Sequence, residues 1–283
     1  MNEKNRFKTL SISLISFWLI VFVLVPVLMV FTVSLLTCEV PGEIKQPFTL
    51  NNYREMFDPV FLKVIFDSFK MAFETTLICL IAGFPFAYNL ARYKGRFKSL
   101  LLMLIIIPFW TSSLIRTYAI IVIIKTNGLL NMALMAAGLI DEPLKLMYTP
   151  LAVMIGMVYS LLPFMILPLY AVLEKLDYKY IEAAKDLGAG RAQTFLHVIL
   201  PLSMPGIIAG SMLVFLPTLC LFYISDVLGG AKTLLIGNFI RNQFLLVRNW
   251  PLGAAASMVL MGLMFIIIYV YYKSSKKAGR EAI

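Results

Sequence analysis

Six long apolar segments constrain the fold of this chain more than any other feature. A helix that crosses a bilayer needs roughly 20 mostly apolar residues, because the hydrocarbon layer is about 30 Å thick and a helix rises about 1.5 Å per residue. The segments that meet this requirement lie at about residues 10–36, 69–91, 99–124, 146–173, 204–224 and 252–272. We therefore predict an all-α integral membrane protein with about six transmembrane helices, in which residues 1–283 form a single transmembrane domain.

The composition supports a membrane protein and argues against a nucleic-acid-binding protein. Of the residues, 60% are hydrophobic and 14% charged, and the mean hydropathy is +0.87. The net charge of +10 could suggest nucleic acid, but a nucleic-acid binder gathers Lys and Arg on one solvated face. Here the basic residues form short clusters between apolar segments, which is typical of membrane topology.

The basic clusters predict the orientation of the chain, because Lys and Arg are enriched in the short cytoplasmic loops of membrane proteins. The clusters are Lys4, Arg6 and Lys8; Arg92, Lys94, Arg96 and Lys98; Lys175, Lys179, Lys185 and Arg191; and Lys273, Lys276, Lys277 and Arg280. With six spans, all four clusters fall on one side. We predict a multi-pass membrane protein with both termini in the cytoplasm; the family resemblance described below implies that the membrane is a bacterial cytoplasmic (inner) membrane.

Neither a metal site nor a catalytic site is predicted. His197 is the only histidine, which excludes zinc sites that need several imidazoles. The three cysteines, Cys38, Cys79 and Cys220, have no CxxC spacing. A membrane-embedded enzyme would need polar catalytic groups gathered at one depth, and the sequence shows no such cluster.

The polar stretch between the fourth and fifth spans, residues 174–203, predicts two short helices. Asp177 can cap the first, which continues to Leu187, and Gly188 to Gly190 permit a left-handed turn that ends it. The second helix is predicted over Arg191 to Leu200, stopped by Pro201 and Pro205. A helix-turn-helix fixed at both ends to spanning helices is suited to transmit force to them.

The same stretch resembles the EAA loop of ABC importer permeases, whose pattern is EAA-x3-G-x9-I-x-L-P. The matching residues are Glu182, Ala183 and Ala184, then Gly188, then Leu200 and Pro201, with Val198 at the position of the family's Ile. The resemblance implies a type I ABC importer permease fold. It also implies that this loop is a coupling helix seated in a groove of a separate ATPase subunit.

The resemblance further implies the partners of this chain. The partners are a second permease subunit, a pair of ATPase subunits, a periplasmic or lipid-anchored binding protein, and membrane lipid. No GxxxxGK[ST] phosphate-binding loop occurs, and Gly229 to Thr233 lack the required spacing. We therefore expect this chain to bind no cofactor, with ATP and Mg on the ATPase subunit.

Within that family the chain is similar to the first permease subunit of spermidine/putrescine importers. The similar segments are Pro108 to Thr111, Ser113 to Arg116, Leu161 to Met165, Pro205 to Gly210, and Ser225-Asp226 followed by Gly229 to Lys232. The resemblance implies import of polyamines. The alternative solutes are another cation, an iron complex or an amino-acid-like compound, and a passive channel or scaffold is a further alternative that leaves the EAA-like loop unused.

Carboxylates and aromatic rings are the groups expected along the route of a polyamine, which is a flexible chain of ammonium groups. Asp226, with Phe222 and Tyr223 within about one helical turn, is the main candidate. Glu74 lies inside the second span, where it either lines the path or pairs with Lys70 at i−4. The remaining candidate rings are those of Trp110, Tyr159 and Tyr118.

Overall fold

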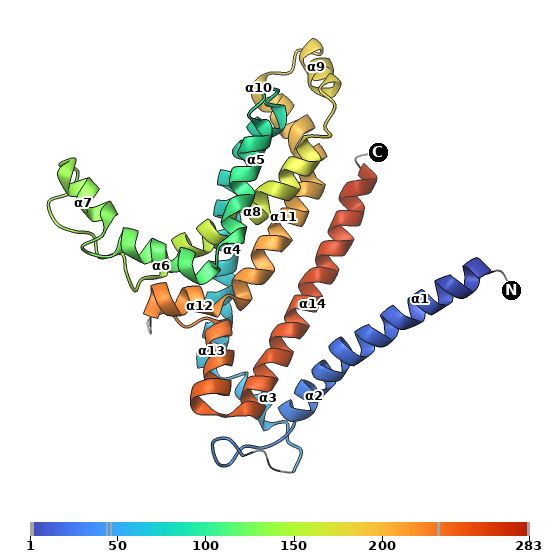
Figure 1. Ribbon diagram of the computed structural model, residues 1–283, viewed down its shortest axis with the longest axis vertical. Helices are drawn as coiled ribbons and strands as arrows, with labels where there is room; N and C mark the ends of the chain where they lie inside the picture. Colours follow the sequence, from blue (N-terminus) through green and yellow to red (C-terminus); the bar gives the residue numbers. More distant parts are fainter. Residues whose placement is uncertain (1–2, 44, 46, 231–232, 282–283) are drawn as a thin grey trace. The chain divides into compact units, whose positions relative to one another are not determined.

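The computed structural model describes the backbone of residues 3–43, 45, 47–230 and 233–281, and the side chains of these ranges between residues 11 and 273. The basic residues near both ends, apart from Lys273, and the pair Ala231–Lys232 lie outside the described side chains. The helices in chain order (Figure 1) are α1 (Glu3–Leu19), η1 (Ile20–Leu24), α2 (Val25–Ser34), α3 (Asn51–Glu55), α4 (Pro59–Arg92), α5 (Lys98–Ile106), η2 (Ile107–Trp110), α6 (Ser113–Ile124), α7 (Leu129–Ala136), α8 (Pro150–Leu173), α9 (Lys179–Asp186), α10 (Arg191–Thr194), η3 (Phe195–Ile199), α11 (Leu200–Cys220), α12 (Phe222–Ile224), η4 (Ser225–Gly229), α13 (Ile236–Asn242), η6 (Gln243–Val247) and α14 (Trp250–Glu281).

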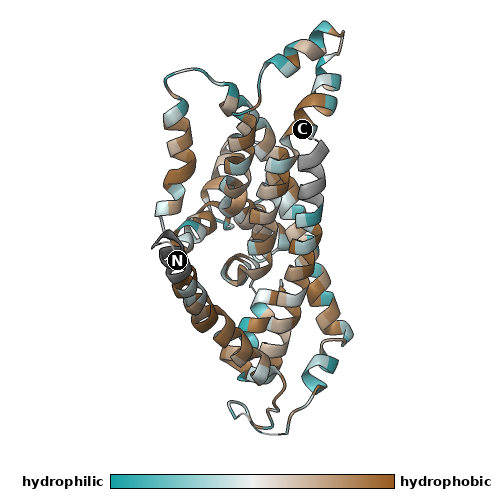
Figure 2. Ribbon diagram, turned by 90° about the vertical axis from the view of Figure 1, so that its right-hand side faces the viewer, coloured by the Kyte–Doolittle hydropathy of each residue, from teal (hydrophilic) through white to brown (hydrophobic). Residues whose placement is uncertain are grey.

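The chain divides into two compact units, residues 1–63 with 239–265, and residues 64–238 with 266–283. In the first unit, α1, η1 and α2 form one uninterrupted helix that is apolar along most of its described length (Figure 2). None of residues 11–33 is buried. Such a helix needs lipid or another protein around it, because it is hydrophobic on every face.

A small polar cluster fixes α3 at the end of α2 within the first unit. The Asn52 amide nitrogen donates to the carbonyl oxygens of Ser34 (2.9 Å) and Leu36 (2.8 Å), and the hydroxyls of Ser34 and Tyr53 lie 2.7 Å apart. The Gly42 amide also donates to the carbonyl oxygen of Arg248 (2.9 Å). These bonds satisfy the carbonyl groups that the end of a helix leaves free.

Among the described residues, five helical segments are long and apolar enough to cross a membrane, at Ser11–Ser34, Ser113–Ala136, Pro150–Leu173, Arg191–Cys220 and Trp250–Lys273. Lys98–Trp110 is a shorter apolar helix. The predicted span 69–91 lies in α4, which is not among these five, and the preceding part of α4 carries Lys63 and Asp67. The helical, multi-span architecture agrees with the sequence prediction.

The prediction of one helix over residues 99–124 is wrong. The structure divides it into α5, η2 and α6, with extended backbone at Thr111 and Ser112. Pro108 lies in the 3₁₀ turn η2 at the point where the α-helix ends. Proline has no backbone N–H and crowds the preceding turn, so it can end a helix even inside an apolar segment.

The prediction that Pro201 and Pro205 stop the helix from Arg191 is also wrong. The helix continues through η3 into α11 as far as Cys220. Residues 195–199 form a π turn in which the Leu200 amide donates to the carbonyl oxygen of Phe195. The wider turn makes room for Pro201, so the helix passes the proline without breaking.

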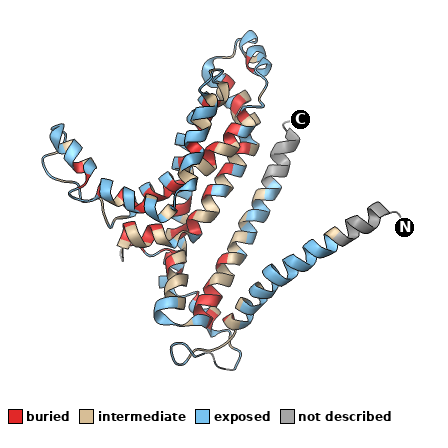
Figure 3. Ribbon diagram, in the orientation of Figure 1, coloured by how far each residue is buried: buried red, intermediate tan, exposed pale blue. Residues whose placement is uncertain are grey.

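The main helix contact in the second unit joins α8 and α11 (Figure 3). Two glycines of α11, Gly206 and Gly210, face α8 at close range: a Cβ on Gly206 would lie 3.1 Å from the Pro168 carbonyl oxygen, and one on Gly210 would lie 2.8 Å from the Met165 sulfur. Small residues with this spacing let two membrane helices approach each other closely.

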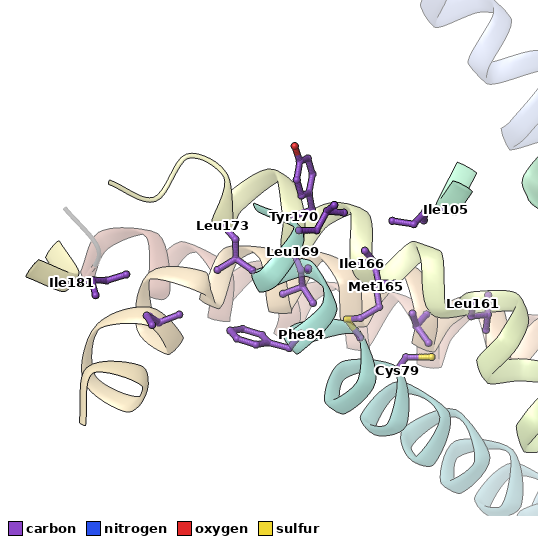
Figure 4. Close-up of a cluster of buried hydrophobic side chains, with 14 residues drawn as sticks. Cys79, Phe84, Ile105, Leu161, Met165, Ile166, Leu169, Tyr170, Leu173 and Ile181 are labelled. Atoms are coloured by element: carbon purple, nitrogen blue, oxygen red, sulfur yellow. The ribbon is translucent and has the colours of Figure 1, made fainter. Parts of the chain in front are cut away.

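The buried cluster that surrounds this contact extends from α4 to the segment between α8 and α11 (Figure 4). It contains Phe84 of α4, Met165 and Leu169 of α8, Ile181 of α9 and Ile199 of η3. One hydrophobic cluster therefore joins the helix pair to the residues that resemble the EAA loop.

Replacing Gly210 with Val should destabilise the protein by about 1–3 kcal/mol, because the new methyl groups would push Met165 out of its packed position. The measurement is the midpoint of thermal unfolding of the full chain in detergent. Gly262→Val is the matched control, since no atom lies within 4 Å of its Cβ position. An equal shift in both variants would contradict close α8–α11 packing as the cause.

Candidate functional site

The first candidate site is α9 together with the turn that follows it. The Gly188 amide donates to the Lys185 carbonyl oxygen (2.9 Å), the Ala189 amide donates to that of Ala184 (3.0 Å), and Gly188 has φ +83°. This pattern is a Schellman cap, which favours glycine at the left-handed position. The predicted turn at Gly188 is therefore present in the structure.

The helix that follows the turn is also capped. The Gly190 amide donates to the Gln193 side-chain oxygen (3.0 Å), and the Thr194 hydroxyl donates to the Gly190 carbonyl oxygen (3.0 Å). At the start of α9, the Lys179 amide donates to an Asp177 carboxylate oxygen (3.0 Å), which agrees with the predicted cap. These local bonds define the geometry of the two helices.

Ile181 attaches α9 to the rest of the second unit. Its side chain is only 3% exposed and lies in the same buried cluster as Leu173, Ile199 and Phe84. Burying a side chain of this size contributes about 1.5–3 kcal/mol. Leu200, at the position of the family's Leu, packs against the same cluster, whereas Pro201 is exposed.

The opposite face of α9 is open. Glu182 and Ala183 are exposed, and the Leu187 side chain is 88% exposed at the tip of the helix. Ala184, Gly188 and Val198 line a groove of about 430 Å³ beside it. An exposed apolar side chain at the end of the helix, beside a shallow groove, is an arrangement that a protein partner can bind.

A series of cation–ring contacts links α9 to the end of α4. The Arg92 guanidinium lies 4.3 Å from the centre of the Tyr88 ring and 5.1 Å from that of Tyr178. On α9, the Lys185 ammonium lies 5.9 Å from the Tyr178 ring. Tyr178 directly precedes α9, so these attractions hold the start of that helix against α4.

A polar group beside these contacts joins α5 to α8. Lys98 and Glu174 form an ion pair at 3.0 Å, and the Tyr170 hydroxyl donates to the same carboxylate oxygen at 2.6 Å. The hydrogen bonds from Tyr170 and Lys98 lower the pKa of the Glu174 carboxyl, and the bond to Glu174 raises the pKa of the Lys98 ammonium. Both groups stay charged at neutral pH, and the stabilisation from Glu174 is lost only as the pH falls through its lowered pKa.

The second candidate site surrounds Asp226. The structure brings Asp226 together with Phe222 and Tyr223 on the short segment from α12 to η4, and the rings of Phe222 and Tyr223 pack edge to face at 6.3 Å. The Asn238 amide nitrogen donates to an Asp226 carboxylate oxygen and to the Phe222 carbonyl oxygen (2.9 Å). The hydroxyl of Tyr223 is hydrogen-bonded to that of Ser113 on α6. Asn238 is buried, and its side-chain oxygen has no hydrogen-bond partner among the described residues.

The other predicted pathway residues lie on separate elements. Glu74 forms an ion pair with Lys70 at 3.9 Å on α4, which is the pairing expected at i−4. Trp110 ends η2 with its side chain 81% exposed, and Tyr159 is an exposed residue of α8. These residues do not lie on the segment that carries Asp226.

Arg116 of α6 is a cation inside an apolar helix. In the described part of the chain it forms no ion pair, and its Nε atom is buried without a hydrogen-bond partner. Within the same residues, no three His, Cys, Asp or Glu side chains are grouped as metal ligands would be. The single histidine of the sequence, His197, has its Nδ1 atom 3.1 Å from the Gln193 carbonyl oxygen.

Sequence reasoning missed Ile181, Leu187 and Asn238. Ile181 and Leu187 are both apolar residues of one short polar segment, and their spacing alone does not show that one is buried and the other exposed. The signal for Asn238 was stronger, because a lone amide inside the apolar run Leu234 to Ile240 needs hydrogen-bond partners when it is buried.

Gly188→Ala should loosen the turn after α9, because an alanine at φ +83° costs about 1 kcal/mol. The amides of Leu187 to Ala189 should then exchange hydrogen about fivefold faster in the full chain. Gly190→Ala is the matched control, since Gly190 has φ −68° and only the Gln193 side chain within 4 Å of its Cβ position. Identical exchange in the two variants would show that the left-handed conformation is not required.

Known proteins are similar to this chain over almost its whole length. The chain is 47% identical over 277 residues to the spermidine/putrescine transport system permease protein PotB of Haemophilus influenzae, and the match covers 98% of this chain and 97% of that protein. It is 50% identical over 264 residues to PotB of Escherichia coli, covering 93% and 96%. The inner membrane ABC transporter permease protein YdcU of Escherichia coli is 34% identical, covering 82% and 76%.

Solved structures show the same fold at low sequence identity. A chain from the crystal structure of a bacterial ABC transporter involved in the import of the acidic polysaccharide alginate has a TM-score of 0.78 and 16% identity, covering 97% of this chain and 96% of that one. The profile of the family described as "Binding-protein-dependent transport system inner membrane component" matches residues 80–278, which include α9, the Gly188 turn and Asp226. The chain therefore belongs to the family of inner membrane components of binding-protein-dependent transport systems.

Proposed function

We propose that this chain is the permease subunit of an ATP-driven importer that moves polyamines, such as spermidine and putrescine, across the cytoplasmic membrane into the cell. Its partners are a second permease subunit, a pair of ATPase subunits and a periplasmic or lipid-anchored polyamine-binding protein. ATP and Mg are bound by the ATPase subunits. This chain is a transport subunit rather than an enzyme, like the relatives described above.

The exposed face of α9 is the observation that supports coupling to an ATPase subunit. Leu187 is 88% exposed and Glu182 is exposed, while Ile181 anchors the helix in the buried cluster. Ile181 lies in the same cluster as Leu173 at the end of α8 and Ile199 just before α11. A partner that moves α9 therefore acts on both helices through the Ile181 side chain. In this proposal ATP-driven movement of the partner shifts the spans between inward-open and outward-open states.

The orientation follows from the same segment. If α9 contacts an ATPase subunit, residues 174–203 lie in the cytoplasm. The basic residues Arg92, Lys94, Arg96 and Lys98 connect α4 to α5, and contacts of Arg92 with Tyr178 place this connection beside α9. Lys and Arg on that side agree with the usual charge distribution of cytoplasmic loops. With the six spans predicted from the sequence, both termini are then cytoplasmic.

The chemistry around Asp226 supports a cationic solute. The Asp226 carboxylate and the rings of Phe222 and Tyr223 lie on one short segment. Asn238 of α13 joins them through the bond from its amide nitrogen to Asp226, and its buried side-chain oxygen has no hydrogen-bond partner among the described residues. Ammonium groups are donors only and are attracted to carboxylates, carbonyl oxygens and ring faces. The names of the relatives at 47–50% identity, which are spermidine/putrescine permeases, point to the same class of solute.

Glu182→Arg should weaken binding of the ATPase subunits more than tenfold, because a partner surface that accepts a carboxylate repels a guanidinium. The measurement is the amount of ATPase subunit that co-purifies with the full chain and the second permease subunit. Membrane insertion should stay unchanged.

Glu142→Arg is the matched control, because Glu142 is an exposed acid of the loop before α8 and makes the same change of charge. Loss of ATPase binding in both variants, or in neither, would contradict the proposed role of Glu182. The α9 role would also fail if the reconstituted chain alone carried out ATP-independent flux of spermidine.

Asp226→Asn should reduce the kcat/KM of spermidine uptake by about tenfold or more, since a charge-assisted contact with an ammonium group is lost. The measurement is ATP-dependent uptake of labelled spermidine, putrescine and a neutral amino acid into vesicles that contain the whole assembly. Asp141→Asn, at an exposed position, controls for the change in charge. Unchanged spermidine kinetics would remove Asp226 from the path, and uptake of the neutral amino acid alone would exclude a polyamine importer.

A further inference from the structure

A basic cavity lies at the end of α4, next to the start of α5 and the end of α8. Its volume is about 700 Å³. Its walls include Arg92, Lys94 and Lys98 from the connection between α4 and α5, and Glu174 and Tyr178 from the residues after α8. Three cations and one carboxylate give the lining a net charge of +2, so the cavity favours an anion.

The cations of the cavity are not equivalent. Lys98 is already neutralised by its ion pair with Glu174 at 3.0 Å, and it also donates to the Ala91 carbonyl oxygen at 3.3 Å. Arg92 lies against the rings of Tyr88 and Tyr178 and forms no ion pair in the described part of the chain. Lys94 is exposed and likewise has no ion pair there. The positive charge available for a ligand therefore comes from Arg92 and Lys94.

The geometry of Arg92 suits an anion with several oxygen atoms. Stacking on two rings holds the planar guanidinium in place without using its N–H groups for a carboxylate. A guanidinium with free N–H groups binds phosphate through paired hydrogen bonds, and a nearby ammonium adds a second, less directional contact. A phosphate group is the anion that matches this pair best.

The rest of the lining indicates where the phosphate comes from. Ala91, Leu173 and Leu176 give the cavity an apolar side, and the helices that end at it, α4 and α8, are apolar segments of an inner membrane protein. With residues 174–203 in the cytoplasm, as proposed above, the cavity lies on the cytoplasmic side of the helices. Basic pockets between helices on that side bind the headgroups of anionic lipids, whose chains continue along the apolar helices. Inorganic phosphate has no apolar group that could pack against Ala91, Leu173 and Leu176.

We propose that this cavity binds the phosphate headgroup of an anionic phospholipid, with Arg92 and Lys94 as the residues that hold it. The site does not depend on which solute the protein transports. Because Tyr178 contacts both Arg92 and, from the side of α9, Lys185, a bound headgroup also steadies the residue from which α9 begins.

The test is native mass spectrometry of the intact chain in detergent, titrated with dioleoylphosphatidylglycerol, dioleoylphosphatidylcholine or inorganic phosphate. We expect the wild-type chain to retain phosphatidylglycerol in preference to phosphatidylcholine. The double variant Arg92→Gln/Lys94→Gln should bind phosphatidylglycerol about tenfold more weakly. Lys94→Gln alone, which changes an exposed side chain without stacking contacts, should give a smaller loss and guards against misfolding of the double variant.

The matched control is Lys179→Gln/Arg191→Gln, which removes two exposed cations of the same side that do not line the cavity. It should leave phosphatidylglycerol binding unchanged. The proposal is overturned if the control loses as much lipid as the cavity variant, if phosphatidylcholine binds equally well, or if inorganic phosphate binds and displaces the lipid at equal concentration. The last result would assign the cavity to a soluble phosphate compound.

Discussion

The close contact between α8 and α11 is the interaction on which the second unit depends. Gly206 and Gly210 let the two helices approach until backbone and side-chain atoms of Pro168 and Met165 fill the space where a Cβ would lie. Lipid tails are as apolar as the side chains they would replace, so tight packing rather than hydrophobic burial holds such helices together. The connection that contains α9 begins at the end of α8 and ends at the start of α11. A fixed helix pair therefore gives α9 two fixed ends.

Movement of α9 can reach the spans because its attachment is both local and specific. Ile181 is buried among residues of α4, α8 and η3, and Tyr178 adds cation–ring contacts to Arg92. The Schellman cap at Gly188 and the cap at Gly190 leave little freedom between α9 and α10. If the spans have two conformations and a partner binds α9 more tightly in one of them, the partner shifts the populations toward that conformation. The size of the shift is set by the difference between the two affinities. The eight-residue helix α9 therefore has a buried residue, Ile181, in its first turn and is followed directly by the exposed Leu187, an arrangement suited to such coupling.

The sequence predicted features whose signal is local or repeated over many residues. The apolar segment 146–173 became α8, and the glycine at 188 became a left-handed cap, because each depends on the residues themselves and little on tertiary context. Prediction failed at prolines: Pro108 ended a helix, while Pro201 was accommodated by a π turn. The same residue type gave opposite results because the outcome depends on whether the preceding turn can widen. The roles of Ile181 and Asn238 needed the tertiary structure, since burial of one face of a short helix and a hydrogen bond across 12 residues leave no periodic signal.

The charged groups around Asp226 and those of the basic cavity have opposite effects on a nearby cation. Around Asp226 the carboxylate and the side-chain oxygen of Asn238 are acceptors, whereas beside α9 the cations Arg92 and Lys94 raise the local potential. Two unit charges of the same sign repel each other by about 1 kcal/mol at 4 Å in water, and the effect is screened beyond about 8–10 Å at physiological salt. A cation within this distance of the cavity is therefore repelled by Arg92 and Lys94. A phosphate in the cavity would offset part of this positive charge, so the repulsion that a cation meets beside α9 depends on what the cavity holds.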